Sequence, residues 1–148
     1  LERLYQNKER LEIREKSMYE IKPIGFVRSG LSSRKEAPKQ GGEGAPDAWV
    51  DVDPAAAEGL AGLSEGDDII LITWFHKSDR SILKVHPRGN TNNPLKGVFC
   101  TRSPDRPNPL GLHRVTVRTI RKNQIQVGPL EAIDGTPVVD IKPVLKKE

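Results

Sequence analysis

The sequence holds one cysteine and three histidines, and it lacks any long hydrophobic run. A single cysteine, Cys100, excludes an internal disulfide and fits a reducing compartment. So few soft ligands make a structural zinc site improbable on composition. No apolar run approaches the roughly 20 residues needed to cross a bilayer, and no signal peptide precedes the first strand-like segment. We therefore expect a cytoplasmic protein with no membrane partner and no metal.

Several catalytic patterns are missing too. No Gly-x-Gly-x-x-Gly stretch joins a strand to a helix, which argues against a Rossmann-type cofactor site. No Ser-His-Asp or Cys-His arrangement stands out, and Cys100, bracketed by a strand-like segment, is expected to pack inside. Acidic clusters of the metal-binding type are also missing, which weakens nuclease and phosphatase interpretations.

Positive charge is unevenly distributed. The chain carries +4, but the segment from His76 to Lys122 holds eleven Lys and Arg against only Asp79 and Asp105, a balance of +9. The remaining residues therefore sum to −5. Such segregation suggests a polyanionic partner, with nucleic acid the first candidate. A solvated face that keeps a small protein in solution is the alternative that charge alone leaves open.

With 148 residues, the chain has room for one domain with a modest core. Residues 1–17 have leucines at near-helical spacing among alternating charges, so we expect an exposed helix or a tail inherited from an expression tag. Met18 precedes the first strand-like stretch and is interpreted as the natural start. Residues 18–148 are then the folded domain.

Within that domain the pattern favours short strands. The expected strands lie at residues 21–27, 48–52, 67–75, 81–87, 97–100, 113–121, 124–130 and within 134–145. The apolar run 67–75 is typical of a central buried strand, with Trp74 in the core. Residues 113–121 alternate, which predicts one buried and one basic face, and Asn123 with its neighbours is expected to form a tight turn into the next strand. A helix should follow Asp53, an N-cap residue, with Pro54 at its first position. These elements predict a mainly β fold, a small single-sheeted antiparallel barrel with one or two short helices.

The loop between residues 97 and 111, GVFCTRSPDRPNPLG, has more constraints than a turn requires. Its three prolines fix φ and remove backbone donors, so the neighbouring carbonyls are expected to stay free to accept. Arg102 and Arg106 supply planar guanidinium groups suited to carboxylates, phosphates or flat rings. Asn108 offers an acceptor for an exocyclic amine, which leads us to the hypothesis of an amine-modifying enzyme. A rigid barrel-closing turn is the alternative.

Two long motifs resemble a known family. GVFCTRSPDRPNPLGL and DGTPVVDIKP, in this order and about 20 residues apart, are similar to those of the TsaA/TrmO-like proteins. PIGFVRS, APKQGGEG and the strand that ends in WFH fit the same pattern. The resemblance spans residues 21 to 145.

This resemblance implies a methyltransferase that uses S-adenosyl-L-methionine on a single small β-barrel and acts as a homodimer. The implied reaction methylates N6 of threonylcarbamoyl-adenosine beside the anticodon of tRNA. Matched position by position, it implies cofactor contacts at Pro38, Lys39, Gln40, His76, Lys77, Arg102, Leu112, Ala132, Ile133, Asp134 and Gly135.

Roles follow from combining the resemblance with residue chemistry. We expect Asn108 to orient the amine, while Arg102 and Arg106 hold a carboxylate of the cofactor or of the threonylcarbamoyl group. Candidates for tRNA phosphates are Arg88, Arg114 and Arg118. Two alternatives stay open: a methyltransferase that acts on another small molecule or a protein, and a non-enzymatic barrel that binds S-adenosyl-L-methionine or RNA.

Overall fold

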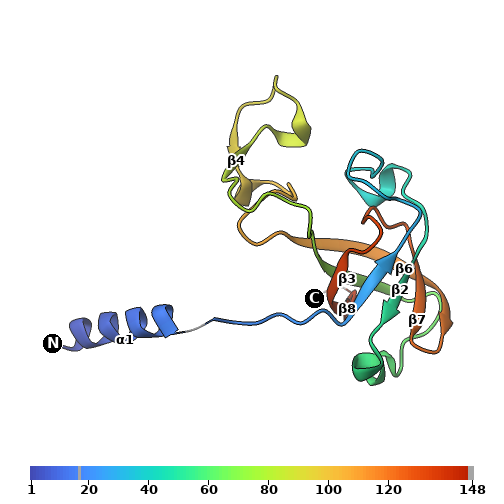
Figure 1. The fold of residues 1–148 in the computed structure, drawn as a ribbon, viewed down its shortest axis with the longest axis horizontal. Coiled ribbons are helices and arrows are strands. Elements are labelled where there is room, and N and C mark those ends of the chain that lie inside the picture. The colour runs from blue at the N-terminus through green and yellow to red at the C-terminus, as the bar shows by residue number, and fades with distance from the viewer. Residues whose placement is uncertain (17, 147–148) are drawn as a thin grey trace.

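The computed structural model describes residues 1–16 and 18–146 (Figure 1). Six strands close into one antiparallel barrel in the order β1-β2-β7-β6-β3-β8. Their bounds are β1 Gly25–Arg28, β2 Ala48–Val52, β3 Asp68–Trp74, β6 Leu110–Arg121, β7 Gln124–Gly128 and β8 Pro137–Pro143. The predicted single-sheeted antiparallel barrel is confirmed.

Strand β6 is the longest of the barrel because it pairs with β3 along its first half and with β7 along its second. A tight turn at Lys122 and Asn123 joins β6 to β7, as predicted, and Lys122 has a φ of 53°. The Asn123 amide donates to the carbonyl of Val52 at 2.6 Å and so ties this turn to the end of β2. The turn end of the β6–β7 hairpin is therefore held against β2.

The core lies inside the barrel and is built from alternate residues of its strands. Its fully buried members are mostly valines, isoleucines and leucines: Val27, Val50, Ile69, Leu71, Val115, Val117, Ile125, Val127, Leu130 and Val138. The prediction that residues 67–75 form a strand buried on both faces is wrong, because β3 alternates between buried and half-buried side chains. Trp74 is on the half-buried face, outside the core, where the Arg80 guanidinium lies 5.1 Å from its ring centroid.

The helix expected after Asp53 is present, but it is a 3₁₀ helix over Pro54–Leu60. The Asp53 carboxylate accepts from the Ala55 N–H at 3.0 Å, which confirms the predicted cap. Ala56 and Leu60 pack from this helix against the bottom of the core.

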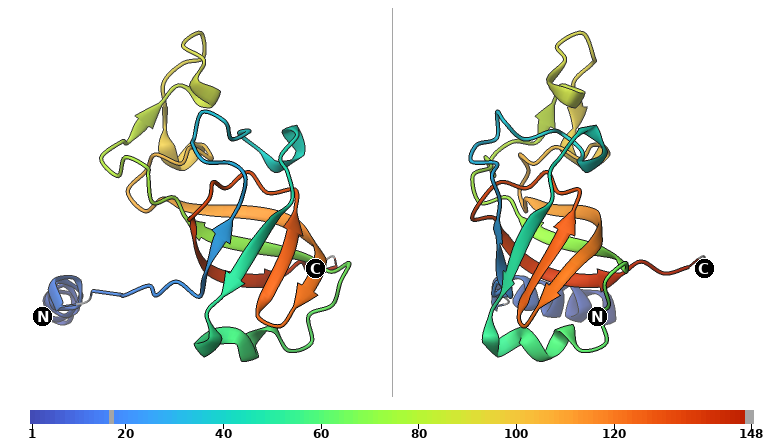
Figure 2. Two further views of the ribbon diagram at one scale, coloured as in Figure 1. Left: turned by 45° about the vertical axis from the view of Figure 1, so that its right-hand side comes forward. Right: turned by 90° about the vertical axis from the view of Figure 1, so that its right-hand side faces the viewer.

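An arm of residues 75–109 leaves the barrel between β3 and β6 and protrudes from one end of it (Figures 1 and 2). It holds a two-stranded sheet of β4 (Lys84–Val85) and β5 (Lys96–Gly97). The strands predicted at 81–87 and 97–100 are therefore wrong in extent: the first shrinks to two residues, and Val98–Cys100 is a 3₁₀ turn. Cys100, expected to pack inside, is exposed.

Helix α1 (Glu2–Lys16) lies apart from the barrel at the far end of an extended segment (Figure 1). Its Leu4 and Tyr5 side chains are exposed. Among the described residues, no helix is both long and apolar enough for a membrane span.

Candidate functional site

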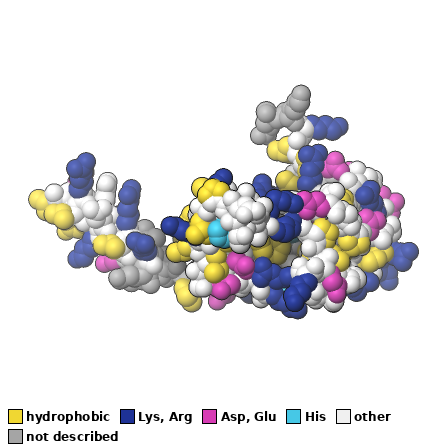
Figure 3. Space-filling model, turned by 90° about the horizontal axis from the view of Figure 1, so that it is seen from above, with side chains coloured by type: hydrophobic (Ala, Val, Ile, Leu, Met, Phe, Trp, Pro, Cys, Tyr) yellow, Lys and Arg dark blue, Asp and Glu magenta, His cyan; other side chains and the backbone are white. Residues whose placement is uncertain are grey.

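A cavity of about 1210 Å³ opens where the arm meets the end of the barrel. Four separated segments line it: the loop 34–40, the residues after β3, the arm with the loop 100–106, and residues 131–136 before β8. Seen from above, dark blue Lys and Arg side chains gather where the arm and the barrel meet (Figure 3). The volume exceeds the roughly 300–1,000 Å³ typical of a small-molecule site, so it has room for two ligands side by side.

The cavity brings together most of the residues that the family resemblance assigned to the cofactor. Its lining includes Pro38, Lys39, Gln40, His76, Lys77, Arg102, Leu112, Ala132 and Ile133. Asp134 and Gly135 lie just beyond it, in the turn before β8. There the Asp134 carboxylate accepts from the Ser29 N–H at 3.0 Å, and the Gly135 N–H donates to Val27 at 2.7 Å. The cofactor roles of these residues stay predictions.

The two arginines of the loop differ in their surroundings. The Arg106 guanidinium donates to the carbonyls of Val98, Thr101 and Ser103, at 2.5, 3.2 and 3.4 Å. Arg102 is exposed and lines the cavity, with no hydrogen-bond or ion-pair partner among the described residues. Arg106 therefore holds the loop together, whereas the Arg102 guanidinium has no partner among the described residues, and the ligand contacts predicted for both arginines stay predictions.

Asn108, the residue predicted to orient an amine, is exposed and lies outside the cavity lining. Its side-chain oxygen accepts from the Arg80 guanidinium at 3.2 Å, and Arg80 also donates to the carbonyl of Pro107 at 2.7 Å. The Pro109 carbonyl accepts from the Phe75 N–H at 2.8 Å. The expectation that proline-flanked carbonyls stay free is therefore corrected, because each of these two already accepts one internal hydrogen bond.

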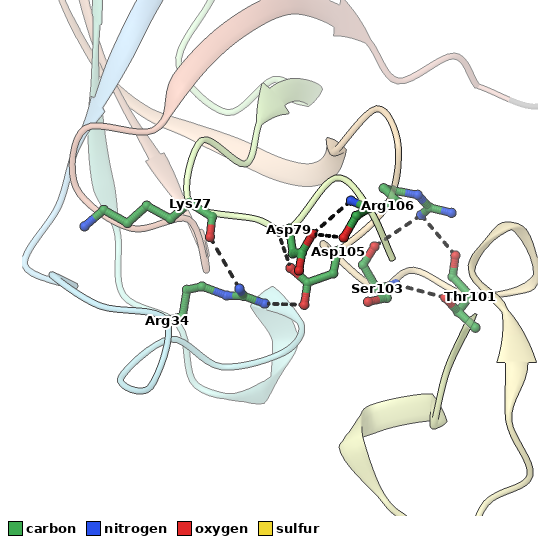
Figure 4. Close-up of polar contacts among 8 residues, drawn as sticks. Arg34, Lys77, Asp79, Thr101, Ser103, Asp105 and Arg106 are labelled. Atoms are coloured by element: carbon green, nitrogen blue, oxygen red, sulfur yellow. Dashed lines mark hydrogen bonds and ion pairs between the residues drawn. The ribbon is translucent and has the colours of Figure 1, made fainter. Parts of the chain in front are cut away.

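Arg34 connects the loop 34–40 to the segment after β3 and to the loop 100–106, which also line the cavity (Figure 4). Its guanidinium donates to the Asp105 carboxylate at 3.1 Å and to the Lys77 carbonyl at 3.5 Å. The other Asp105 oxygen accepts from the Asp79 N–H at 2.9 Å. Both oxygens of Asp105 are therefore taken by the protein itself.

His76 lies exposed at the rim, directly after β3. Partial burial lowers the pKa of its imidazole below the usual value, and the neighbouring Lys77 ammonium lowers it further. The lowered pKa favours the neutral His76 ring, which has both a donor and an acceptor nitrogen.

The three arginines expected to contact RNA all have acidic neighbours. Arg88 pairs with Glu43, while Arg114 lies 3.6 Å from Asp68 and Arg118 lies 3.6 Å from Asp47. Arg88 lines the cavity, whereas Arg114 and Arg118 lie on the outward face of β6. Their RNA contacts stay predictions.

Two residues near the cavity were missed at the level of sequence. His113 points into the barrel and is buried, and its Nδ1 lies 2.6 Å from the Glu131 carboxylate. Glu131 lines the cavity. Eighteen residues separate the pair, and no spacing rule links a strand histidine to a glutamate beyond the next strand. Within residues 1–16 and 18–146, no group of three or more His, Cys, Asp or Glu side chains is arranged to hold a metal ion.

Curated relatives similar to this chain are named for S-adenosyl-L-methionine. A probable S-adenosyl-L-methionine-binding protein of Methanocaldococcus jannaschii is 45% identical over 129 residues, which cover 84% of this chain and 91% of that protein. A similarly named protein of Pyrococcus horikoshii is 47% identical over 128 residues, 84% of this chain and 81% of that one.

Solved structures are similar as well. The crystal structure of TrmO from Pseudomonas aeruginosa matches with a TM-score of 0.69 and 28% identity over 87% of this chain. Another TrmO crystal structure matches with a TM-score of 0.71 and 30% identity, again over 87% of this chain. The present chain spans 57% and 58% of those two chains, somewhat more than half of their length. The family model of the tRNA-methyltransferase O N-terminal domain matches residues 26–148. The expected resemblance is confirmed, and the chain belongs to the family of the tRNA-methyltransferase O N-terminal domain.

Proposed function

We propose that this protein methylates N6 of threonylcarbamoyl-adenosine beside the anticodon of tRNA, with S-adenosyl-L-methionine as the methyl donor. One observation carries the proposal: a single cavity is lined by nine of the eleven positions that the family resemblance assigns to the cofactor. The relatives named for S-adenosyl-L-methionine support the choice of cofactor.

The lining fits the cofactor in chemistry as well as in size. Phe75, Leu112, Ala132 and Ile133 offer an apolar surface for a nucleoside, and Arg102 offers a free guanidinium for a carboxylate. The volume of about 1210 Å³ leaves space for a target nucleoside beside the cofactor. When bound, S-adenosyl-L-methionine supplies an electrophilic methyl group, which the protein itself cannot provide.

The protein's own part is positioning. Asn108 lies outside the cavity lining, on the loop between the lining residues Arg106 and Leu110, so it would meet the part of the target nucleoside that extends beyond the cavity. Its side-chain oxygen has two lone pairs, and Arg80 uses one of them, so the other is available to an N–H. Arg80 also holds the Pro107 carbonyl at 2.7 Å, which limits the movement of this loop. N6 of threonylcarbamoyl-adenosine carries the carbamoyl group and a single N–H. Methyl transfer would form the N6–C bond as the S–C bond breaks, leaving the thioether, and the N6 proton would pass to solvent. Alignment of the two reactants accounts for most of the expected rate gain.

The choice of tRNA as the substrate is supported by the distribution of positive charge. The +9 segment from His76 to Lys122 spans the arm and β6. Attraction of this kind draws in a polyanion such as tRNA, and it weakens as salt is added. An unpaired anticodon loop presents splayed bases, the form in which proteins read single-stranded RNA.

We also propose that two copies associate through the arm. Its Leu83, Leu95 and Phe99 side chains are 61%, 57% and 81% exposed, a large apolar surface for so short a segment. Light scattering during size-exclusion chromatography should give twice the chain mass, and Phe99→Glu should shift it toward the monomer. A monomer at high concentration would contradict this part of the proposal.

The decisive experiment supplies the protein with labelled S-adenosyl-L-methionine and three acceptors: tRNA with threonylcarbamoyl-adenosine, the same tRNA with plain adenosine, and the free modified nucleoside. We expect label only in the first, as a methylated nucleoside detected by mass spectrometry. Label in a protein or in a small molecule alone would favour the alternative substrates. Cofactor binding without transfer to any acceptor would favour a non-enzymatic binding barrel.

A further inference from the structure

A chain of three polar side chains connects the barrel interior to the cavity lining. Thr73 Oγ1 lies 2.7 Å from His113 Nε2, and His113 Nδ1 lies 2.6 Å from Glu131 Oε1. Thr73 and His113 are both almost completely buried, at 0% and 2% exposure, whereas the Glu131 side chain is 14% exposed, into the cavity. The chain therefore runs from the barrel interior to the ligand space.

Local sequence explains why this chain forms. Thr73 on β3 stands opposite Gly111 on β6, and His113 is two residues further along on the same inward face. Because Gly111 has no side chain, the His113 ring occupies that space and reaches Thr73. A Cβ on Gly111 would come within 2.6 Å of Thr73 Oγ1 and 2.8 Å of His113 Nε2. Phe75 packs edge-on against the ring, with centroids 5.7 Å apart, and fixes its plane.

The hydrogen bonds follow from the partners. An ionised carboxylate only accepts, so we assign the proton on Nδ1 as the one that His113 donates to Glu131 Oε1; in the tautomer with Nε2 unprotonated, Nε2 accepts from the Thr73 hydroxyl. Oε1 therefore already accepts a hydrogen bond from His113. Oε2 lies near Gly41, where an added Cβ would come within 3.1 Å of it. Among the described residues, Oε2 has no hydrogen-bond donor, so it is the acceptor offered to a ligand.

The Glu131 carboxylate lies in a cavity lining that is otherwise mostly basic. The lining is rich in basic side chains: Arg34, Lys35, Lys39, Lys77, Arg88, Lys96, Arg102 and Arg106. The acidic residues of the described lining are Asp105 and Glu131, and Asp105 already has a donor on each oxygen. Glu131 is therefore the acidic side chain of the described lining that still has an oxygen without an internal donor, and a cationic part of a ligand is a partner suited to it.

We propose that Glu131, oriented by His113, binds the primary ammonium group at the amino-acid end of S-adenosyl-L-methionine. The inference rests on the proposed function and names a contact within it. An ammonium has three N–H donors for an acceptor such as Oε2, whereas a sulfonium has none. The carboxylate next to that ammonium would meet the free guanidinium of Arg102, which lines the same cavity.

Calorimetry on the purified protein tests the contact with a set of adenosine thioethers. S-adenosylhomocysteine has the ammonium and no sulfonium, methylthioadenosine has neither charged group, and the carboxypropyl thioether keeps the carboxylate alone. A charge-assisted hydrogen bond is worth about 10- to 100-fold in affinity. We expect Glu131→Gln to lower the affinity for S-adenosylhomocysteine by that factor. Its affinities for methylthioadenosine and for the carboxypropyl thioether should stay unchanged.

His113 is tested as a positioning residue by the same ligand series. His113→Phe removes the donor to Glu131 and should weaken S-adenosylhomocysteine by about 3- to 10-fold. His113→Asn keeps an N–H donor near the position of Nδ1 and should recover part of that loss. A purely structural role would change methylthioadenosine binding equally. Glu58→Gln is the matched charge control, because Glu58 lies in the 3₁₀ helix outside the cavity lining, and we expect it to bind every ligand as the wild type does.

The remaining outcomes separate failure of the Glu131–ammonium contact from failure of the proposed methyltransferase function. Unchanged S-adenosylhomocysteine affinity in Glu131→Gln overturns the ammonium contact alone. If Glu131→Gln binds S-adenosyl-L-methionine more weakly but S-adenosylhomocysteine as tightly as the wild type does, Glu131 contacts the sulfonium. That result also overturns the ammonium contact. Should Glu131→Gln not fold, the wild type still provides the test, because it should bind the carboxypropyl thioether about 10-fold or more weaker than S-adenosylhomocysteine. A wild type that binds none of these compounds overturns the proposed function itself.

Discussion

The Arg80 guanidinium lies over the Trp74 ring, 5.1 Å from its centroid, and donates to Asn108 Oδ1 at 3.2 Å. The same guanidinium holds the Pro107 carbonyl at 2.7 Å. Trp74 ends β3, so this stack connects the barrel wall to the loop that carries the proposed amine-orienting residue. The position of Asn108 therefore depends on a residue 28 positions earlier.

The first prediction concerns this connection. Arg80→Ala removes a cation–π contact and two hydrogen bonds at an exposed site, and we expect a loss of about 1–2 kcal/mol in the free energy of unfolding. Asn108→Ala should lower kcat for the modified tRNA and leave cofactor affinity unchanged. The double variant should show a coupling of about 0.5–1.5 kcal/mol in the free energy of unfolding, measured by denaturant titration. Strict additivity of the two changes would contradict the contact.

The second prediction separates the two arginines of one loop. Arg106→Ala removes the guanidinium that donates to the Thr101 and Ser103 carbonyls and, beside the Thr101 N–H and hydroxyl, to the Val98 carbonyl, so we expect about 2 kcal/mol less stability against denaturant. Arg102→Ala should change stability by less than about 0.5 kcal/mol, because Arg102 has no partner in the described chain. Yet it should weaken S-adenosylhomocysteine about 10-fold or more by calorimetry. Equal effects of both substitutions on stability would contradict this division.

A third prediction uses the missing side chain of Gly111. Gly111→Ala places a Cβ 2.5 Å from Phe75 Cζ and 2.8 Å from His113 Nε2, so the ring must move. Overpacking of this kind costs about 1–3 kcal/mol, visible as a lower midpoint in thermal unfolding. Gly42→Ala is the matched control, because nothing lies within 4 Å of its added Cβ. The prediction is wrong if the two variants unfold alike.

Features that depend on neighbours in the chain could be predicted from the sequence, whereas contacts between distant segments could not. The alternation in β6, the turn at Lys122 and the cap at Asp53 were predicted correctly, because each depends on neighbours in the chain. The segment 97–100 was taken for a strand because a short apolar run looks the same in a strand and in a 3₁₀ turn. The pairing of His113 with Glu131 depends on barrel closure and on the space above Gly111, which no local pattern records.

The fourth prediction is a titration of His76. Since burial is the larger cause of its lowered pKa and the Lys77 ammonium the smaller, Lys77→Gln should raise this pKa only part of the way to the usual value of about 6.5. NMR titration of the imidazole carbon signals measures both values. A complete return to the usual value in Lys77→Gln would contradict the dominance of burial.

The sign of the stability effect follows from the same shift. The unfolded chain binds the His76 proton more tightly than the folded chain does. This residue's contribution to stability is therefore present above the unfolded pKa and is lost as pH falls from there through the folded pKa. His76→Gln should remove that part of the pH dependence, measured as unfolding free energy across this window.

The last prediction concerns the outward arginines of β6. If Arg114 and Arg118 contact tRNA phosphates, each change to alanine should reduce the slope of log affinity against log salt by about 0.7–0.9. Arg121→Ala is the matched control on the same strand, because the Arg121 guanidinium lies 5.4 Å from the Trp49 ring and is not among the proposed contacts. Asp68→Asn and Asp47→Asn remove the acidic neighbours of the two arginines and should strengthen tRNA binding at low salt. Binding slopes that fall equally in all three arginine variants would indicate a diffuse field of charge instead of defined phosphate contacts.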